Sequence, residues 1–258
     1  MLTKQDVTKN ILREMSEERY QEVKDNLSNI SNYAGHENKS IDEEARAVMT
    51  KEASLKLKDI FDIMKLDFRE DANLIDTPMR LASMWVNELM VGRYQNAPRI
   101  EAFPNQIEAI SYGPTDYPMI DGVEVVSPVN SRMIVSKKVD VDSLCSHHFM
   151  PFFDTGSNSY GLVAYKPSDK LLGISKLQRV VNHFGARPQL QEQMLGQIHE
   201  YIKKVIQSDD VLVIGQNIMH TCETARGVKS SVGRTSVTLY SGIFEDSALR
   251  QEMLLQAQ

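Results

Sequence analysis

Two short motifs place the chain's only two cysteines beside histidines. One runs from Cys145 to His148 with the spacing C-x-x-H, and the other runs from His220 to Cys222 with the spacing H-x-C. Thiolate and imidazole groups are ligands that zinc prefers, and a catalytic zinc site combines three protein ligands with one open position. We therefore predict that Cys145, His148 and Cys222 bind a metal ion.

The other histidines of these motifs, His147 and His220, would lie beside the metal without binding it. An imidazole titrates near neutral pH and is therefore suited to proton transfer. The alternative is that the cysteines are small buried apolar side chains and the histidines are ordinary hydrogen-bonded groups. Two such motifs in a chain with no other cysteine favour the metal site. Spacing alone does not distinguish catalytic zinc from iron or from a structural site.

A second group of residues is suited to binding phosphate. Ser175, Lys176 and Arg179 fall in the first turns of an expected helix, where free backbone N–H groups already attract anions. Arg226 follows Cys222 closely and can present a guanidinium fork to the same anion. The alternative is a solvated basic patch, because lysine and arginine are mostly exposed.

Gln191 and Glu192 lie near the start of a second expected helix. A carboxylate there can accept two hydrogen bonds, from the N1–H and the 2-amino group of guanine. Alternatively, Glu192 only complements the helix dipole, as acidic residues in a first turn commonly do.

The first half of the chain is predicted to be mainly helical. Residues 1–50 are rich in polar side chains and are expected to form weakly packed helices, as an arm that docks on another subunit. A helix ending near Asp67 is predicted by apolar residues at helical spacing: Leu57, Ile60, Phe61 and Met64. Thr77 and Pro78 suit the N-cap and first residue of the next helix. Residues 93–130 are rich in proline and are expected to be mostly loop with short extended pieces.

The second half is predicted to contain both strands and helices. Alternating side chains indicate a strand over 132–141, and a strand pair is expected around the turn at 154–158. Helices are expected to begin with Ser175 as N-cap and at Pro188, followed by strands at 211–215 and 235–244 and a short helix from Ser247. This order predicts an α+β protein with helices on one face of an antiparallel sheet.

The composition excludes some classes of protein. The chain has 258 residues, and a net charge of −6 argues against a nonspecific nucleic-acid binder. No signal-peptide pattern or apolar run of membrane-spanning length is visible, and two cysteines are too few for a disulfide framework. We expect a cytoplasmic protein with a helical arm (1–68), a helix and long loop (69–130) and a catalytic domain (131–258).

Taken together, the motifs resemble those of the GTP cyclohydrolase I family. The family patterns C-E-H-H-x-x-P-F, G-[LI]-S-K-x-x-R-[IV]-V and H-x-C-x-x-x-R-G correspond here to CSHHFMPF, GISKLQRVV and HTCETARGV. The segments VAYKP, ARPQLQEQ and DTPMRLASMWVNEL are also similar to the family. The resemblance covers about residues 55–100 and 130–245 and includes several independent motifs in the same order.

The resemblance implies a tunnelling fold, in which sheets from several subunits close into a barrel, usually as a homodecamer with active sites between subunits. It implies conversion of GTP and water to formate and 7,8-dihydroneopterin triphosphate, the first step of pterin, folate or 7-deazaguanine synthesis. Zn2+ would be held by Cys145, His148 and Cys222. Proton transfer is implied for His147, His220 and Ser175. Substrate binding is implied for Lys176, Arg179 and Arg226 at the triphosphate and ribose, and for Gln191 and Glu192 at guanine.

Several differences from the family pattern bear on function. Ser146 replaces a glutamate, Gln193 replaces an arginine, and the segments after Phe152 and between Ile100 and Met133 are longer. An alternative function is therefore a zinc- and nucleotide-binding protein of this fold with lost or altered activity. A related enzyme of deazapurine synthesis with a lone nucleophilic cysteine is disfavoured by the presence of both metal motifs.

Overall fold

The structure is a computed structural model that describes residues 3–30, 41–100, 102–104, 119–120, 123–124, 134–168 and 170–257. The chain forms two compact units. The first contains the N-terminal helices together with two short segments, Ser143–Phe149 and Gly185–Gln189. The second contains most of the β-sheet and the helices of the C-terminal half. Among the described residues, no helix combines the length and apolar character needed to cross a membrane.

The first unit begins with three helices, α1 (Lys4–Glu14), α2 (Glu17–Ser28) and α3 (Glu43–Ile63), which confirm the helical prediction. The N-cap residues are Thr3, Ser16 and Asp42 respectively, and each side chain accepts a hydrogen bond from a backbone N–H of the first turn. The expectation of weak packing is wrong, because α2, α3 and the residues just before α3 share a buried apolar cluster: Tyr20, Val23, Ile41, Ala45 and Val48. Burial of these side chains stabilises the helices.

The predicted apolar face of α3 is only half correct. Leu57 and Phe61 are buried, whereas Ile60 is 46% exposed and Met64 is 61% exposed. The next helix, α4 (Thr77–Met84), has Asp76 as its N-cap and proline in its first turn, so the predicted cap at Thr77 is wrong by one residue. The chain continues through a π-helical segment, η1 (Trp85–Leu89), and a 3₁₀ turn, η2 (Val91–Arg93).

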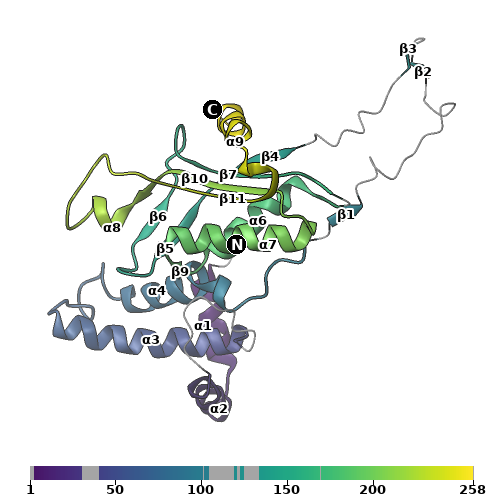
Figure 1. The fold of residues 1–258 in the computed structure, drawn as a ribbon. Coiled ribbons are helices and arrows are strands. Elements are labelled where there is room, and N and C mark those ends of the chain that lie inside the picture. The colour runs from purple at the N-terminus through teal and green to yellow at the C-terminus, as the bar shows by residue number, and fades with distance from the viewer. Residues whose placement is uncertain are drawn as a thin grey trace. The chain divides into compact units, whose positions relative to one another are not determined.

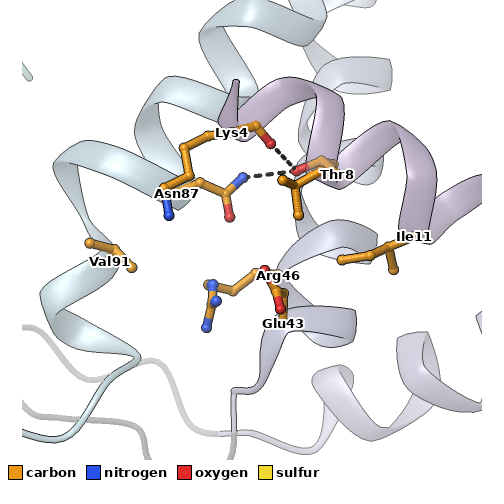
Figure 2. Close-up of a pocket in the computed structure, with 8 residues that line it drawn as sticks. Lys4, Thr8, Ile11, Glu43, Arg46, Asn87 and Val91 are labelled. Atoms are coloured by element: carbon orange, nitrogen blue, oxygen red, sulfur yellow. Dashed lines mark hydrogen bonds between the residues drawn. The ribbon is translucent and has the colours of Figure 1, made fainter. Parts of the chain in front are cut away.

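A small polar cavity lies between α1, α3 and η1 (Figure 2). Its lining includes Lys4, Thr8, Glu43, Arg46 and Asn87. The Asn87 Nδ2 group lies 3.3 Å from Thr8 Oγ1 and 3.2 Å from Thr50 Oγ1, and the Thr8 hydroxyl donates to the Lys4 carbonyl oxygen. One amide from η1 therefore joins two helices that are far apart in sequence.

Asn87→Ala is expected to lower the free energy of unfolding by about 1–3 kcal/mol, because buried hydroxyl groups lose their donor. The measurement is denaturant unfolding of the intact protein followed by far-UV circular dichroism. Asn10→Ala, at an exposed position of α1, is the matched control and should change stability little. Equal stability of the two variants would contradict the joining role of Asn87.

The second unit is built on antiparallel strands in the order β4 (Val135–Val139), β7 (Tyr160–Tyr165), β10 (Val211–His220) and β11 (Thr235–Tyr240) (Figure 1). Strand β6 (Pro151–Phe153) pairs with the C-terminal end of β10, and β7 pairs with its N-terminal part. The strands predicted around residues 154–158 are therefore present, but each pairs with β10 instead of with the other. This arrangement places the end of β10 beside β6.

The sheet is mixed, which corrects the prediction of a purely antiparallel one. Strand β5 (Asp142–Cys145) pairs in parallel with β9 (Pro188–Gln189). Helix α7 consequently begins at Gln191 and runs to Ile206, so Pro188 does not begin a helix as predicted. Helix α6 spans Ile174–Gly185, which puts Ser175 in its first turn and not at its N-cap.

Helices also cover both faces of the second unit's sheet, not one face as predicted. Helices α6 and α7 lie on one side, and α9 (Ser247–Gln256) lies on the other (Figure 1). The α9 side is a buried cluster: Tyr160, Leu162, Ala164, Leu212, Ile214, Phe244, Met253 and Ala257. On the opposite face, Gly215 approaches the side chains of Gln191 and Leu195 from α7. The α+β class is confirmed.

The remaining elements are short. They are β1 (Ala102–Pro104), which pairs with β8 (Lys170–Leu172), β2 (Met119–Ile120), which pairs with β3 (Val123–Glu124), α8 (Thr221–Thr224) and the 3₁₀ helix η3 (Gly242–Glu245). The extended pieces β1, β2 and β3 fit the predicted loop with short strands. The rest of residues 105–130 lies outside the described residues.

Candidate metal centre and surrounding residues

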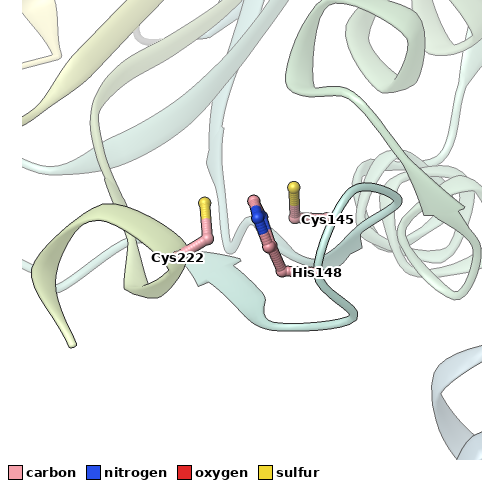
Figure 3. A group of neighbouring side chains, drawn as sticks. All are labelled: Cys145, His148 and Cys222. Carbon is pink, nitrogen blue, oxygen red and sulfur yellow. The ribbon is translucent and has the colours of Figure 1, made fainter. Parts of the chain in front are cut away.

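The three predicted metal ligands lie together (Figure 3). Cys145 ends β5, His148 lies in the turn that follows, and Cys222 lies in α8. The ligand atoms of these three side chains are all within 4.8 Å of one another. Cys145 is buried, Cys222 is half-buried and His148 is exposed, so the group is open on one side.

Backbone contacts hold the two motifs in place. After β5 the chain turns tightly: the Phe149 N–H donates to the Cys145 carbonyl oxygen at 2.9 Å, and Phe149 has a left-handed φ of 53°. At the other motif, the Thr221 hydroxyl donates to the Pro151 carbonyl oxygen at 2.6 Å. This bond joins the start of α8 to β6.

The donor set fits a zinc ion. Two thiols and one imidazole are typical zinc ligands, and three protein ligands leave a fourth tetrahedral position for water or substrate. The two cysteines are not joined in a disulfide, so both sulfur atoms can act as ligands. A fully structural zinc site would require a fourth protein ligand, and the described residues offer three in this group.

His220 is held at the end of β10 by two contacts. Its Nε2 atom lies 2.8 Å from Gln191 Oε1, and its ring stacks on Phe152 with the centroids 4.9 Å apart and the planes 12° apart. Burial lowers the pKa of His220 below its ordinary value of 6.5, and the carboxylates of Glu192 and Glu223 oppose this shift. The neutral imidazole is therefore favoured at neutral pH.

The other predicted residues are distributed as follows. His147 is exposed in the turn after β5, and its ring meets that of His148 edge to face at 6.3 Å. On α6, Ser175 and Arg179 are exposed and Lys176 is half-buried. Arg226 is exposed just after α8.

Gln191 and Glu192 open α7 but differ sharply in exposure. Gln191 is 1% exposed, whereas Glu192 is exposed in the first turn. Because the Glu192 carboxylate acts on the pKa of His220, these two groups lie near each other. Together with Glu223, which acts on the same pKa, Glu192 gives the predicted proton-transfer histidine two acidic neighbours.

Three contributors to the site were not found from the sequence. Phe152 stacks on His220, Thr221 anchors α8, and Gly215 leaves room for the Gln191 side chain. Each acts through a contact between strands or helices, and no local pattern marks it. Phe152 and Thr221 lie inside the motifs CSHHFMPF and HTCETARGV, and this is their only signal in the sequence.

The fold and the site define an α+β protein with a Cys–His–Cys group that could hold a metal ion. The family model for GTP cyclohydrolase I matches residues 53–258. Similar proteins include "GTP cyclohydrolase 1" from Vibrio vulnificus, 32% identical over 77% of this chain and 79% of that protein. Those from Erwinia tasmaniensis and a Shewanella species are 30% and 31% identical, over 77% and 78% of this chain and 78% and 82% of their own lengths. The chain belongs to the GTP cyclohydrolase I family.

Proposed function

We propose that this chain is a zinc-dependent GTP cyclohydrolase I that converts GTP and water to formate and 7,8-dihydroneopterin triphosphate. The observation that carries the proposal is the group formed by Cys145, His148 and Cys222, whose ligand atoms lie within 4.8 Å of one another. Family membership over residues 53–258 supports the same conclusion. The similar proteins bear the name of this activity.

The metal centre would activate water for the reaction. Cys145, His148 and Cys222 would hold Zn2+, which supplies Lewis-acid activation of water when bound. Cys145 is buried, so water has little access to compete with its thiolate for the metal. The exposed side at His148 leaves the substrate a route of approach.

The proton transfers of the reaction are assigned to side chains around the centre. His220 is held neutral by burial and can accept a proton on its free ring nitrogen. His147 is exposed in the turn beside a ligand and is assigned to a second transfer. Ser175, exposed in the first turn of α6, is assigned to the later rearrangement of the ribose.

Substrate binding is assigned to two ends of the nucleotide. The Glu192 carboxylate accepts two hydrogen bonds from guanine. Gln191, the residue before it at the start of α7, is assigned to the same end of the nucleotide. Lys176 and Arg179 in the first turns of α6 bind the triphosphate, with Arg226 as a third cation. Binding of the distant triphosphate would position C8 of guanine for reaction.

Lys176→Met is expected to raise the KM for GTP by about 10- to 100-fold, because each charge-assisted hydrogen bond is worth about 1.5–3 kcal/mol. Lys204→Met, at an exposed position near the end of α7, is the matched control and should leave KM unchanged. The measurement is initial rate against GTP concentration on the zinc-loaded protein. Identical KM values for the two variants would contradict the phosphate role of Lys176.

We also propose how the chain assembles. The catalytic domain would be residues 131–258, preceded by a helix and loop at 69–130 and a helical arm at 1–68 that serves assembly. Sheets of several subunits would close into a barrel, as a homodecamer with active sites between subunits. A cytoplasmic location fits two cysteines that form no disulfide. Size-exclusion chromatography with light scattering tests the subunit number.

The direct test of the activity uses purified, zinc-loaded protein with GTP. Formate and the fluorescent pterin obtained by oxidation of the product should appear in equal amounts. GTP binding without either product, with the metal present and the oligomer intact, would refute the enzyme and favour a binding protein. Ser146, which replaces the family's glutamate beside the ligands, would then be the first residue to restore to glutamate.

A further inference from the structure

The side-chain amide of Gln191 is enclosed by protein and meets two specific groups. The residue is 1% exposed. Its Oε1 atom lies 2.8 Å from His220 Nε2, and its Nε2 atom donates to the Gly215 carbonyl oxygen at 3.4 Å. Both ends of the amide are therefore occupied by residues of β10.

The Gly215 carbonyl determines which way this amide faces. A carbonyl oxygen only accepts hydrogen bonds, so the amide group beside it must be the NH2 group of Gln191. The reversed amide would place its oxygen against the Gly215 carbonyl oxygen and lose that hydrogen bond, so the contact at Gly215 favours the orientation with Oε1 toward His220. With Oε1 facing His220, the ring nitrogen that meets it must be the donor.

We propose that Gln191 is a positioning residue that holds His220 as the tautomer with its proton on Nε2, so that the lone pair of the ring lies on Nδ1. This inference rests on the proposed function, because it states at which atom His220 acts. A neutral imidazole has a single N–H, so a fixed donor at Nε2 fixes the acceptor at Nδ1. The stacked ring of Phe152 holds the plane in which Nδ1 lies.

Gly215 offers an independent way to disturb the same arrangement. A Cβ atom at this position would lie 2.8 Å from Gln191 Nε2 and 3.1 Å from Leu195 Cδ1. A closely packed interior does not accept contacts this short without movement. Gly215→Ala should therefore displace the amide without removing it.

The test is nitrogen NMR of the zinc-loaded, full-length protein labelled with ¹⁵N-histidine, in which His220→Asn identifies the His220 signals. We expect the unchanged chain to show the proton on Nε2, and Gln191→Met to show a mixture of tautomers or the proton on Nδ1. We expect Gln191→Met to lower kcat at least about 10-fold with little change in KM. In serine proteases, a substitution that gives the wrong histidine tautomer lowers kcat by about 10,000-fold. Gln197→Met on the same helix is the matched control and should change neither quantity.

The possible outcomes separate this inference from the activity itself. A proton on Nδ1 in the unchanged chain, or a tautomer that Gln191→Met and Gly215→Ala both leave unaltered, overturns the role of Gln191. If Gln191→Met does not fold, Gly215→Ala alone decides by the same signal. If the unchanged chain releases no formate, the proposed function fails, while the NMR signals of His220 still decide whether Gln191 fixes the tautomer.

Discussion

Cys222→Ser is expected to remove zinc from the protein and to lower formate release by more than about 100-fold. Mutation of a residue that only supports a metal ligand already lowers metal affinity or activity by about 10- to 100-fold. A serine hydroxyl has a much higher pKa than a thiol and is a poor zinc ligand. The loss leaves Cys145 and His148, and two protein ligands are fewer than a catalytic zinc site uses. Zinc per chain is measured by elemental analysis, and activity by formate.

The chain has no third cysteine, so the matched control uses histidine. His148→Asn should behave like Cys222→Ser, whereas His183→Asn, on α6 and outside the ligand group, should retain zinc and turnover. Circular dichroism of all three variants checks that the fold is kept. Full zinc content and normal formate release in Cys222→Ser would refute the metal centre.

The ligands could be predicted from sequence because their chemistry is a property of residue type. Thiol and imidazole groups at C-x-x-H and H-x-C spacing already specify a tight local geometry, and the fold needed only to bring two turns together. The buried face of α6 was equally predictable. Helical spacing predicts an inner face of four residues, and all of them are buried: Leu177, Val180, Val181 and Phe184.

Other features depend on contacts that local patterns do not encode. Pro188 has the properties of a first helical residue, but its backbone pairs with β5, and the helix starts at Gln191 instead. Helix α9 was predicted, whereas its position on the second face of the sheet follows from the apolar side chains of β7 and β10 that it covers. The stacking of Phe152 on His220 likewise arises from strand pairing between β6 and β10.

The difference in burial between Gln191 and Glu192 is another feature of the substrate site that a local sequence pattern does not encode. The sequence motif assigned both residues to guanine, but only Glu192 is exposed. In a first helical turn, successive side chains point in directions about 100° apart, so neighbours in sequence face different surroundings. Glu192 is therefore the residue whose removal should most directly affect recognition of the base.

Glu192→Gln is expected to lower kcat/KM for GTP by about 100- to 1,000-fold, because one charge-assisted hydrogen bond worth about 1.5–3 kcal/mol is lost and the other loses its charge. The amide that replaces the carboxylate has only one acceptor atom, and its NH2 group faces a donor of guanine. Zinc content should stay unchanged, which separates this variant from Cys222→Ser. Glu200→Gln, two turns later on the same helix and also exposed, is the matched control.

The same variant should also lose discrimination between bases. Inosine triphosphate lacks the 2-amino group of guanine, so a carboxylate that binds N1–H and the amino group should favour GTP over it. In Glu192→Gln one of these contacts is already lost, and the ratio of kcat/KM for the two nucleotides should fall by about 10-fold or more. An unchanged ratio would place the base elsewhere and leave Glu192 as a group that acts on His220 through charge alone.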